Sequence, residues 1–171
     1  MEEKVLFILS QICSINEKPG KKLIQKLMYL VQEKGVDLGL DYRIYYYGPY
    51  SRILDQLLRY YELENYLDID TSETTHTVKL RETVKCTGNG FSAHEKEVVK
   101  QVLAEYAQRK PYDLELLTTT EFAANYILNK DTCDEKAIVN KVKEIKGSKF
   151  TVKQIQASVK ELKSADLLGT V

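Results

Sequence analysis

The chain has 171 residues, of which 43% are hydrophobic and 29% are charged, and its 25 Lys and Arg residues balance its 25 Asp and Glu residues. A chain of this length buries roughly 70% of its unfolded surface and forms one domain or two small ones. The zero net charge excludes a global field that would hold nucleic acid or an anionic membrane. No apolar run approaches the roughly 20 residues of a membrane span.

Cysteine usage and the start of the chain indicate a cytoplasmic protein. Cys13, Cys86 and Cys133 are far apart and form no C-x-x-C pair, so we expect each to be a small buried apolar residue. Residues 1–4 are acidic and the apolar stretch at 5–9 is too short for the core of a signal peptide.

Helical periodicity predicts three helices in the first half of the chain, at residues 2–14, 21–34 and 50–64. The apolar stripe of the second helix is wide, so we expect this helix to be packed on more than one side.

A short strand is predicted at residues 42–47, where aromatic and β-branched side chains are concentrated. Alternation places Ile44 and Tyr46 on one face and the residues between and beside them on the other. Gly48 and Pro49 are expected to end the strand, because proline suits the first position of a new helix.

Two alternating runs, at 66–70 and 76–81, predict a hairpin around the polar loop 71–75. Three helices followed by a hairpin is the order of a winged-helix module, which we place at residues 1–90. The link between the second and third helices is much longer than the roughly 3 or 4 residues of a DNA-reading helix-turn-helix.

Residues 91–171 predict a helical C-terminal region packed on the first module. Ser92 and Glu95 match a capping box at the start of one helix, and Thr151 and Gln154 match a second box at the start of the last. Asp113 is expected to cap the helix that follows Pro111. A shorter helix is predicted at 135–146. The fold class is therefore mainly α with a small β-hairpin.

The chain offers little for catalysis. A metal site needs three or four converging ligands, and the only histidines are His76 and His94, eighteen positions apart. No nucleophile elbow, phosphate-binding loop or dinucleotide-binding motif is present. We expect no catalytic residues, no metal and no cofactor; an enzyme using Cys or His is the weakest hypothesis.

Tyrosine is concentrated in one part of the chain, with eight of the twelve tyrosines between residues 42 and 66. Tyrosine joins a large apolar ring to a hydrogen-bonding tip and is enriched at interfaces. These rings either pack the strand against a helix, or some of them form a contact surface, for which Tyr45, Tyr47 and Tyr50 are the candidates.

A local basic stretch, Lys18, Lys21, Lys22 and Lys26, is joined by Arg43, Arg52 and Arg59 in the expected fold. These residues form either a solvated face or a nucleic-acid contact. Over residues 1–90, however, 12 Lys and Arg residues face 13 Asp and Glu residues, whereas nucleic-acid binders concentrate positive charge.

Three segments carry a family resemblance: residues 20–30 (GKKLIQKLMYL), 42–44 (YRI) and 47–51 (YGPYS). In them the chain resembles the YwgA family of uncharacterised prokaryotic proteins. It is more distantly similar to Panacea-domain proteins, which include SocA-like antitoxins and proteolytic adaptors. The likeness covers mainly residues 5–67. The resemblance implies a compact cytosolic protein and, through the more distant group, one that acts by binding another protein. The YwgA family itself has no assigned activity that could be transferred to this chain.

The residues themselves allow two interpretations of the same segments. Gln25, Lys26 and Tyr29 lie within one helical turn and share a face, next to the point where Gly48 and Pro49 direct the third helix. Tyr29 and the Gly-Pro pair are either part of this face or purely architectural. The predicted partner-binding residues are Gln25, Lys26, Tyr29, Arg43, Tyr45, Tyr47, Tyr50, Ser51, Arg52 and Arg59.

Two functions follow as hypotheses. The first is a non-catalytic regulatory protein that binds a protein partner through the tyrosine-rich strand–helix face, as an antitoxin or adaptor would. The alternative is a winged-helix transcriptional regulator, a homodimer that presents residues 50–59 to DNA and uses the 66–86 hairpin as its wing. Neither involves a membrane.

Overall fold

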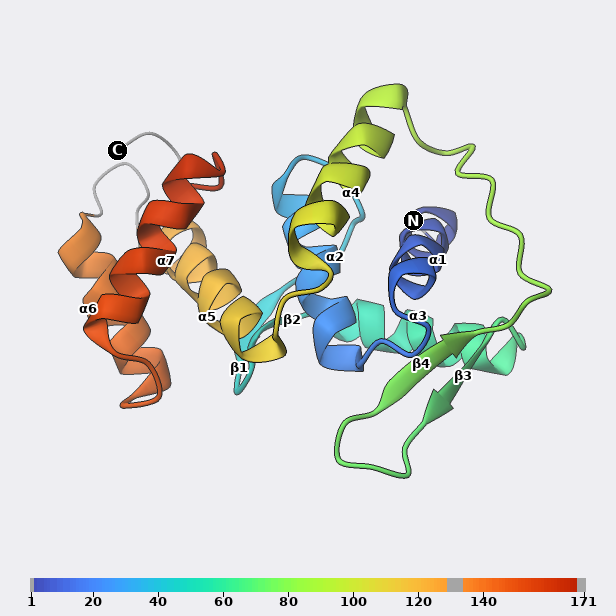
Figure 1. Cartoon of the computed structure of the whole chain (residues 1–171), viewed down its shortest axis with the longest axis horizontal. Coiled ribbons are helices and arrows are strands. Elements are labelled where there is room, and N and C mark those ends of the chain that lie inside the picture. The colour runs from blue at the N-terminus through green and yellow to red at the C-terminus, as the bar shows by residue number, and fades with distance from the viewer. Residues whose placement is uncertain (1, 129–133, 169–171) are drawn as a thin grey trace. The chain divides into compact units, whose positions relative to one another are not determined.

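The computed structural model describes residues 2–128 and 134–168, and it is mainly helical with a small β component, as the sequence predicts (Figure 1). The contacts between backbone segments divide the chain into two compact units. The first unit contains the chain up to Arg43 and Tyr50–Pro111; the second contains Ile44–Pro49 and the chain from Tyr112 onward.

The first unit is built on four helices: α1 (Glu2–Ile15), α2 (Lys21–Glu33), α3 (Arg52–Leu63) and α4 (Ala93–Tyr106). In α1 the buried residues Val5, Ile8, Leu9 and Ile12 form a single stripe at helical spacing. In α2 every residue from Leu23 to Val31 is buried, which confirms that this helix is packed on more than one side.

The predicted hairpin is present as β3 (Leu67–Asp70) and β4 (Thr77–Leu80), paired antiparallel with Leu67 opposite Leu80. The link between α1 and α2 lies along β4. The Val78 amide donates to the Pro19 carbonyl at 3.0 Å, and Gly20 forms an isolated bridge with Thr77. The link between the first two helices therefore adds backbone pairing to the edge of the hairpin.

The strand predicted at 42–47 is wrong in its length, and because Tyr46 and Tyr47 lie in a turn, the predicted alternation does not extend to them. The chain forms β1 (Arg43–Tyr45) and β2 (Gly48–Tyr50), joined by a turn at Tyr46 and Tyr47. Gly48 has a φ of 93°, a left-handed value that glycine adopts without a Cβ clash. A turn followed by a glycine of this kind is a common hairpin loop, and it overrides the continuous strand propensity of the tyrosines.

The predicted start of the third helix is also wrong. Pro49 lies in β2, and α3 begins at Arg52 after Ser51, whose hydroxyl accepts a hydrogen bond from the Leu54 amide at 3.2 Å. Serine is a strong N-cap because its side chain satisfies an amide that has no partner inside the helix.

The second unit contains α5 (Pro111–Phe122), a π-helical turn η1 (Ala123–Ile127), α6 (Glu135–Lys146) and α7 (Val152–Ser164). Pro111, the first residue of α5, is the last residue of the first unit. α6 and α7 pack side by side (Figure 1).

The two predicted capping boxes are confirmed, with Ser92 and Glu95 opening α4 and Thr151 and Gln154 opening α7. The Asp113 cap is wrong, because Pro111 is already the first residue of α5 and Asp113 lies in its first turn.

α4 packs on α1 and α2, so the contacts place it in the first unit, and the contact-defined division falls after Pro111. The sequence-based boundary between residues 90 and 91 predicts two domains, and it stays a prediction. None of the helices in residues 2–128 and 134–168 combines the length and apolar character that crossing a membrane requires.

The cysteines differ from the prediction of full burial. Cys13 and Cys86 are free thiols and only half-buried. Burial raises the pKa of Cys13 to about 11, against a smaller lowering by a backbone hydrogen bond from Leu80. Cys133 lies outside the described residues.

Candidate functional site

The ten predicted partner-binding residues do not share one environment. Four are buried (Gln25, Lys26, Tyr29 and Ser51), Tyr50 is half-buried, and five are exposed (Arg43, Tyr45, Tyr47, Arg52 and Arg59).

Gln25 and Ser51 hold the fold of the first unit. The Gln25 side-chain amide donates to the Ser51 carbonyl at 2.9 Å, and the Ser51 amide donates to Gln25 Oε1 at 2.9 Å. A buried backbone group without a partner is costly, so this double hydrogen bond fixes where α3 starts. We therefore assign these two residues to the architecture rather than to a binding surface.

Tyr29 has no solvent exposure, and its ring meets Tyr42 edge-to-face with centroids 4.9 Å apart. Lys26 is also almost fully buried. Of the two interpretations of this helix face, the structure supports the architectural one for Tyr29.

The most exposed aromatic side chains of the hairpin form what we call the tyrosine turn, residues Tyr45, Tyr46 and Tyr47. Their exposed fractions are 39%, 91% and 50%, respectively. A tyrosine at 91% exposure hides almost none of its apolar ring from water. Exposed aromatic rings of this kind are typical of surfaces that bind another molecule.

A charged cluster of the second unit holds the backbone of the tyrosine turn. Lys146 Nζ donates to the Tyr46 carbonyl at 2.6 Å and to Glu115 Oε1 at 2.8 Å. Lys149 Nζ donates to both oxygens of Glu115, at 2.7 and 2.8 Å. Glu115 thus pairs with both lysines, one carboxylate between two ammonium groups, and Lys146 anchors the turn.

Lys149 also lies against aromatic rings. Its Nζ is 5.6 Å from the centroid of Tyr47 and 5.7 Å from that of Tyr112. At such distances an ammonium is attracted to the negative face of the ring. The Tyr112 hydroxyl in turn donates to the Lys149 carbonyl at 2.9 Å. The tyrosine turn is therefore positioned from both its backbone and its Tyr47 side chain.

In this cluster, burial and ion pairing shift the pKa values of Glu115 and Lys146 in opposite directions. Burial by itself would raise the pKa of Glu115, but the hydrogen bonds from Lys146 and Lys149 outweigh it and the pKa is lowered. Burial lowers the pKa of Lys146, although Glu115 opposes that shift. The three hydrogen bonds to Glu115, 2.7 to 2.8 Å long, are charge-assisted contacts between one carboxylate and two ammonium groups.

Arg59 of α3 is only partly available for an anionic partner, because it is paired with Asp55. Arg59 Nε donates to Asp55 Oδ2 at 3.3 Å, and Asp55 also pairs with Lys21. Burial alone would raise the pKa of Asp55, but hydrogen bonds from Lys21 and then Arg59 lower it. Asp55 therefore neutralises part of the basic stretch that the sequence suggested.

Sequence reasoning missed Tyr46, which it placed on the opposite face from Tyr45 and Tyr47, and it missed Glu115, Lys146 and Lys149. A signal for Tyr46 was present in Gly48, two residues later, which permits a turn. The charged residues carry no local signal, because they lie about 70 to 100 positions away in the sequence and reach the turn only through the fold.

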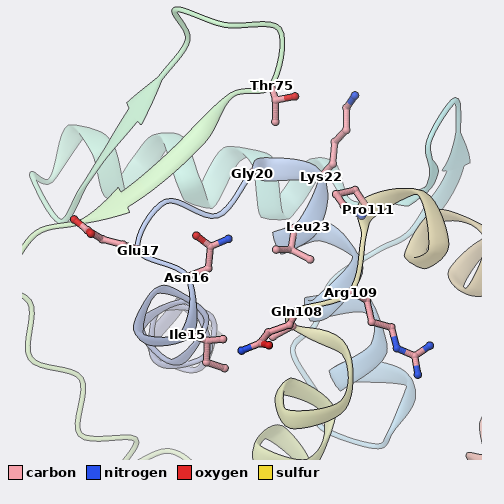
Figure 2. A pocket seen from close by; sticks show the side chains of 11 residues that line it. Ile15, Asn16, Glu17, Gly20, Lys22, Leu23, Thr75, Gln108, Arg109 and Pro111 are labelled. Atoms are coloured by element: carbon pink, nitrogen blue, oxygen red, sulfur yellow. The ribbon is translucent and has the colours of Figure 1, made fainter.

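One cavity of the first unit, about 640 Å³ in volume, lies between the ends of α1, α2 and α4 (Figure 2). Its two basic side chains, Lys22 and Arg109, extend in different directions away from the space (Figure 2). They do not converge on one point, as an anion site requires.

Within residues 2–128 and 134–168, no three His, Cys, Asp or Glu side chains are grouped closely enough to hold a metal ion. Comparison with known proteins gives no further assignment: no family model and no curated protein matches the chain.

Proposed function

We propose that the chain is a non-catalytic regulatory protein that binds a protein partner, in the manner of an antitoxin or adaptor, and that the tyrosine turn is its contact surface. The observation that carries the proposal is the 91% exposure of Tyr46 on a turn whose backbone is fixed by Lys146.

Two physical arguments support this function. Tyrosine supplies a large contact area with few rotatable bonds, so ordering it in a complex costs little conformational entropy. A backbone that is already held by Lys146 loses little further freedom on binding, and such pre-organisation raises affinity.

The experiment is affinity capture from a lysate of cells that express the protein, with quantification of each captured protein by mass spectrometry. Wild type is compared with Tyr46→Ala and with Tyr45→Ala/Tyr47→Ala. The matched control is Tyr126→Ala, which removes a 58% exposed tyrosine from η1 of the same unit.

We expect a partner that is captured by wild type and Tyr126→Ala and is reduced at least about tenfold with Tyr46→Ala, the size of effect typical of an aromatic anchor. Retention of the same partners by folded Tyr46→Ala and Tyr45→Ala/Tyr47→Ala would show that the tyrosine turn is not the contact surface.

One observation favours the alternative, a winged-helix DNA-binding regulator. Gly20 pairs with Thr77, so the link between α1 and α2 adds to the edge of the β3–β4 hairpin. Such a hairpin, placed after three helices, occupies the position of the wing in a winged-helix module. This function predicts retention on duplex DNA at low salt and a steep loss of binding as salt rises. Absence of retention at low ionic strength would remove it.

A further inference from the structure

A second cavity of the first unit, about 720 Å³ in volume, lies between the C-terminal end of α3 and the connection from β4 to α4. Three tyrosines line it: Tyr60, Tyr61 and Tyr66. Its volume falls within the range of pockets that enclose a small ligand, and a single amino-acid side chain is no larger than such a ligand.

The end of α3 brings these rings together. Asn65 adopts a left-handed φ of 59°, its amide donates to the Glu62 carbonyl at 3.0 Å, and the Tyr66 amide donates to the Tyr61 carbonyl at 2.8 Å. This pair of hydrogen bonds is the Schellman motif, which returns the residue after the left-handed one to the last turn of the helix. Tyr66 therefore lies beside Tyr61, with ring centroids 6.2 Å apart.

The rings form a continuous aromatic wall that is open to solvent at both ends. Tyr60 and Tyr61 have centroids 5.9 Å apart. Tyr60 is 43% exposed and Tyr66 is 37% exposed, whereas Tyr61 is buried and donates to the Glu2 carbonyl at 2.6 Å. The central ring, Tyr61, is therefore fixed by the fold, whereas the rings of Tyr60 and Tyr66 are exposed enough to contact a ligand.

The charged residues that line this cavity are mostly acidic. Glu2, Glu3 and Glu64 contribute three carboxylates, and Lys85 contributes the one cation. The negative charge of Glu64 raises the pKa of Tyr60, with further increases from burial and from the charge of Glu2. A negative, aromatic cavity repels nucleic acid and attracts cations.

We propose that this aromatic–acidic cavity binds a basic peptide segment of a protein partner, with an arginine or lysine side chain laid against Tyr60 and Tyr66. Cations bind over tyrosine rings by cation–π attraction, and arginine does so most often. Glu64 pairs with the same cation. This proposal does not rest on the tyrosine turn, which belongs to the other unit.

The test uses the full chain and the peptide Ac-Gly-Arg-Gly-Arg-Gly-NH2, followed by amide chemical-shift titration. The matched peptide replaces both arginines with citrulline, which keeps the shape and removes the charge. The variants are Glu64→Gln and Tyr60→Leu, with Glu73→Gln in the exposed loop between β3 and β4 as the charge control. Tyr46→Ala is the control for the tyrosine turn.

We expect shifts at Tyr60, Tyr66 and Cys86, which also lines the cavity, and at least about tenfold weaker binding of the citrulline peptide. Glu64→Gln and Tyr60→Leu are each expected to weaken binding about threefold to tenfold. Glu73→Gln and Tyr46→Ala are expected to bind as wild type does.

Equal binding of the arginine and citrulline peptides, or unchanged binding by Glu64→Gln and Tyr60→Leu, would overturn the proposal. So would sedimentation showing a dimer that Tyr60→Leu dissociates, because a second copy would then be the occupant. Circular dichroism melting confirms that each variant is folded. Loss of peptide binding in Tyr46→Ala would overturn the assignment to this cavity alone, and leaves the proposed function to its own test.

Discussion

The side chain of Gln25 makes one hydrogen bond to the backbone amide of Ser51 and another to its carbonyl, each 2.9 Å long. The Gln25 side chain, which lies on α2, thus pairs with the backbone of Ser51 as a neighbouring β-strand would, by one donated and one accepted hydrogen bond. Because both residues are buried, water does not replace either bond. This contact joins α2 to the start of α3 across 26 positions of sequence.

Replacement of Gln25 by leucine is expected to destabilise the protein by about 1 to 3 kcal/mol, because it leaves the buried amide of Ser51 unsatisfied. The Ser51 carbonyl keeps its hydrogen bond from the Asp55 amide, 3.2 Å long. Urea unfolding followed by circular dichroism measures this. The control Gln101→Leu removes an exposed side-chain hydrogen bond to Glu97 in α4 and is expected to change stability by less than about 0.5 kcal/mol. Similar midpoints for the two variants would contradict the assigned role of Gln25.

The helices and the β3–β4 hairpin were predictable because their information is local. The stripe of Val5, Ile8 and Leu9 repeats at the helical period, and the run from Leu67 to Asp70 alternates with period two. Capping boxes are similarly local, since Ser92 and Glu95 need only their spacing.

The tyrosine turn was not predictable from propensity. Tyr46 and Tyr47 favour a strand by themselves. The hydrogen bond that holds the turn comes from Lys146, which is itself paired with Glu115, and both lie far along the chain. The burial of Gln25 and Lys26 was not predictable either. Both are polar types that usually lie on the surface, yet the fold buries them.

Gly48→Ala is expected to destabilise the protein by about 1 to 2 kcal/mol, because a φ of 93° brings a Cβ too close to the following backbone. Gly90→Ala is the control, since its added Cβ would meet only Lys4 Cγ, at an ordinary 3.9 Å. Thermal unfolding compares the two variants. Equal melting temperatures would show that the turn does not need a glycine.

Glu115→Gln is expected to destabilise the second unit by about 3 to 5 kcal/mol, because it leaves the buried ammonium of Lys146 without a counter-charge. Tyr46 is expected to lose its anchor at the same time, so proteolysis at the tyrosine turn should accelerate. Urea unfolding and mass spectrometry of limited digests measure the two effects.

The control for Glu115→Gln is Glu144→Gln, which removes an exposed pair with Lys141 and is expected to cost less than about 1 kcal/mol. A loss of stability in Glu115→Gln no larger than in the control would show that the Glu115 cluster does not stabilise the fold.

Burial raises the pKa of Glu121 from an ordinary 4.5 to about 8, against a smaller lowering by the 2.6 Å hydrogen bond from Asn125. Between these two values the unfolded chain releases this proton while the folded chain keeps it. Stability is therefore expected to fall as pH rises from 4.5 to 8, by at most about 1.4 kcal/mol per pH unit.

Glu121→Gln keeps an acceptor for Asn125 and removes the titration, so its free energy of unfolding should exceed that of wild type at pH 8 and approach it at pH 4. Urea unfolding at pH 4, 6 and 8 measures the difference. Glu144→Gln is again the control, because it makes the same chemical change at an exposed carboxylate that pairs with Lys141. A constant difference between wild type and Glu121→Gln at all three pH values would mean that Glu121 does not keep its proton in the folded protein.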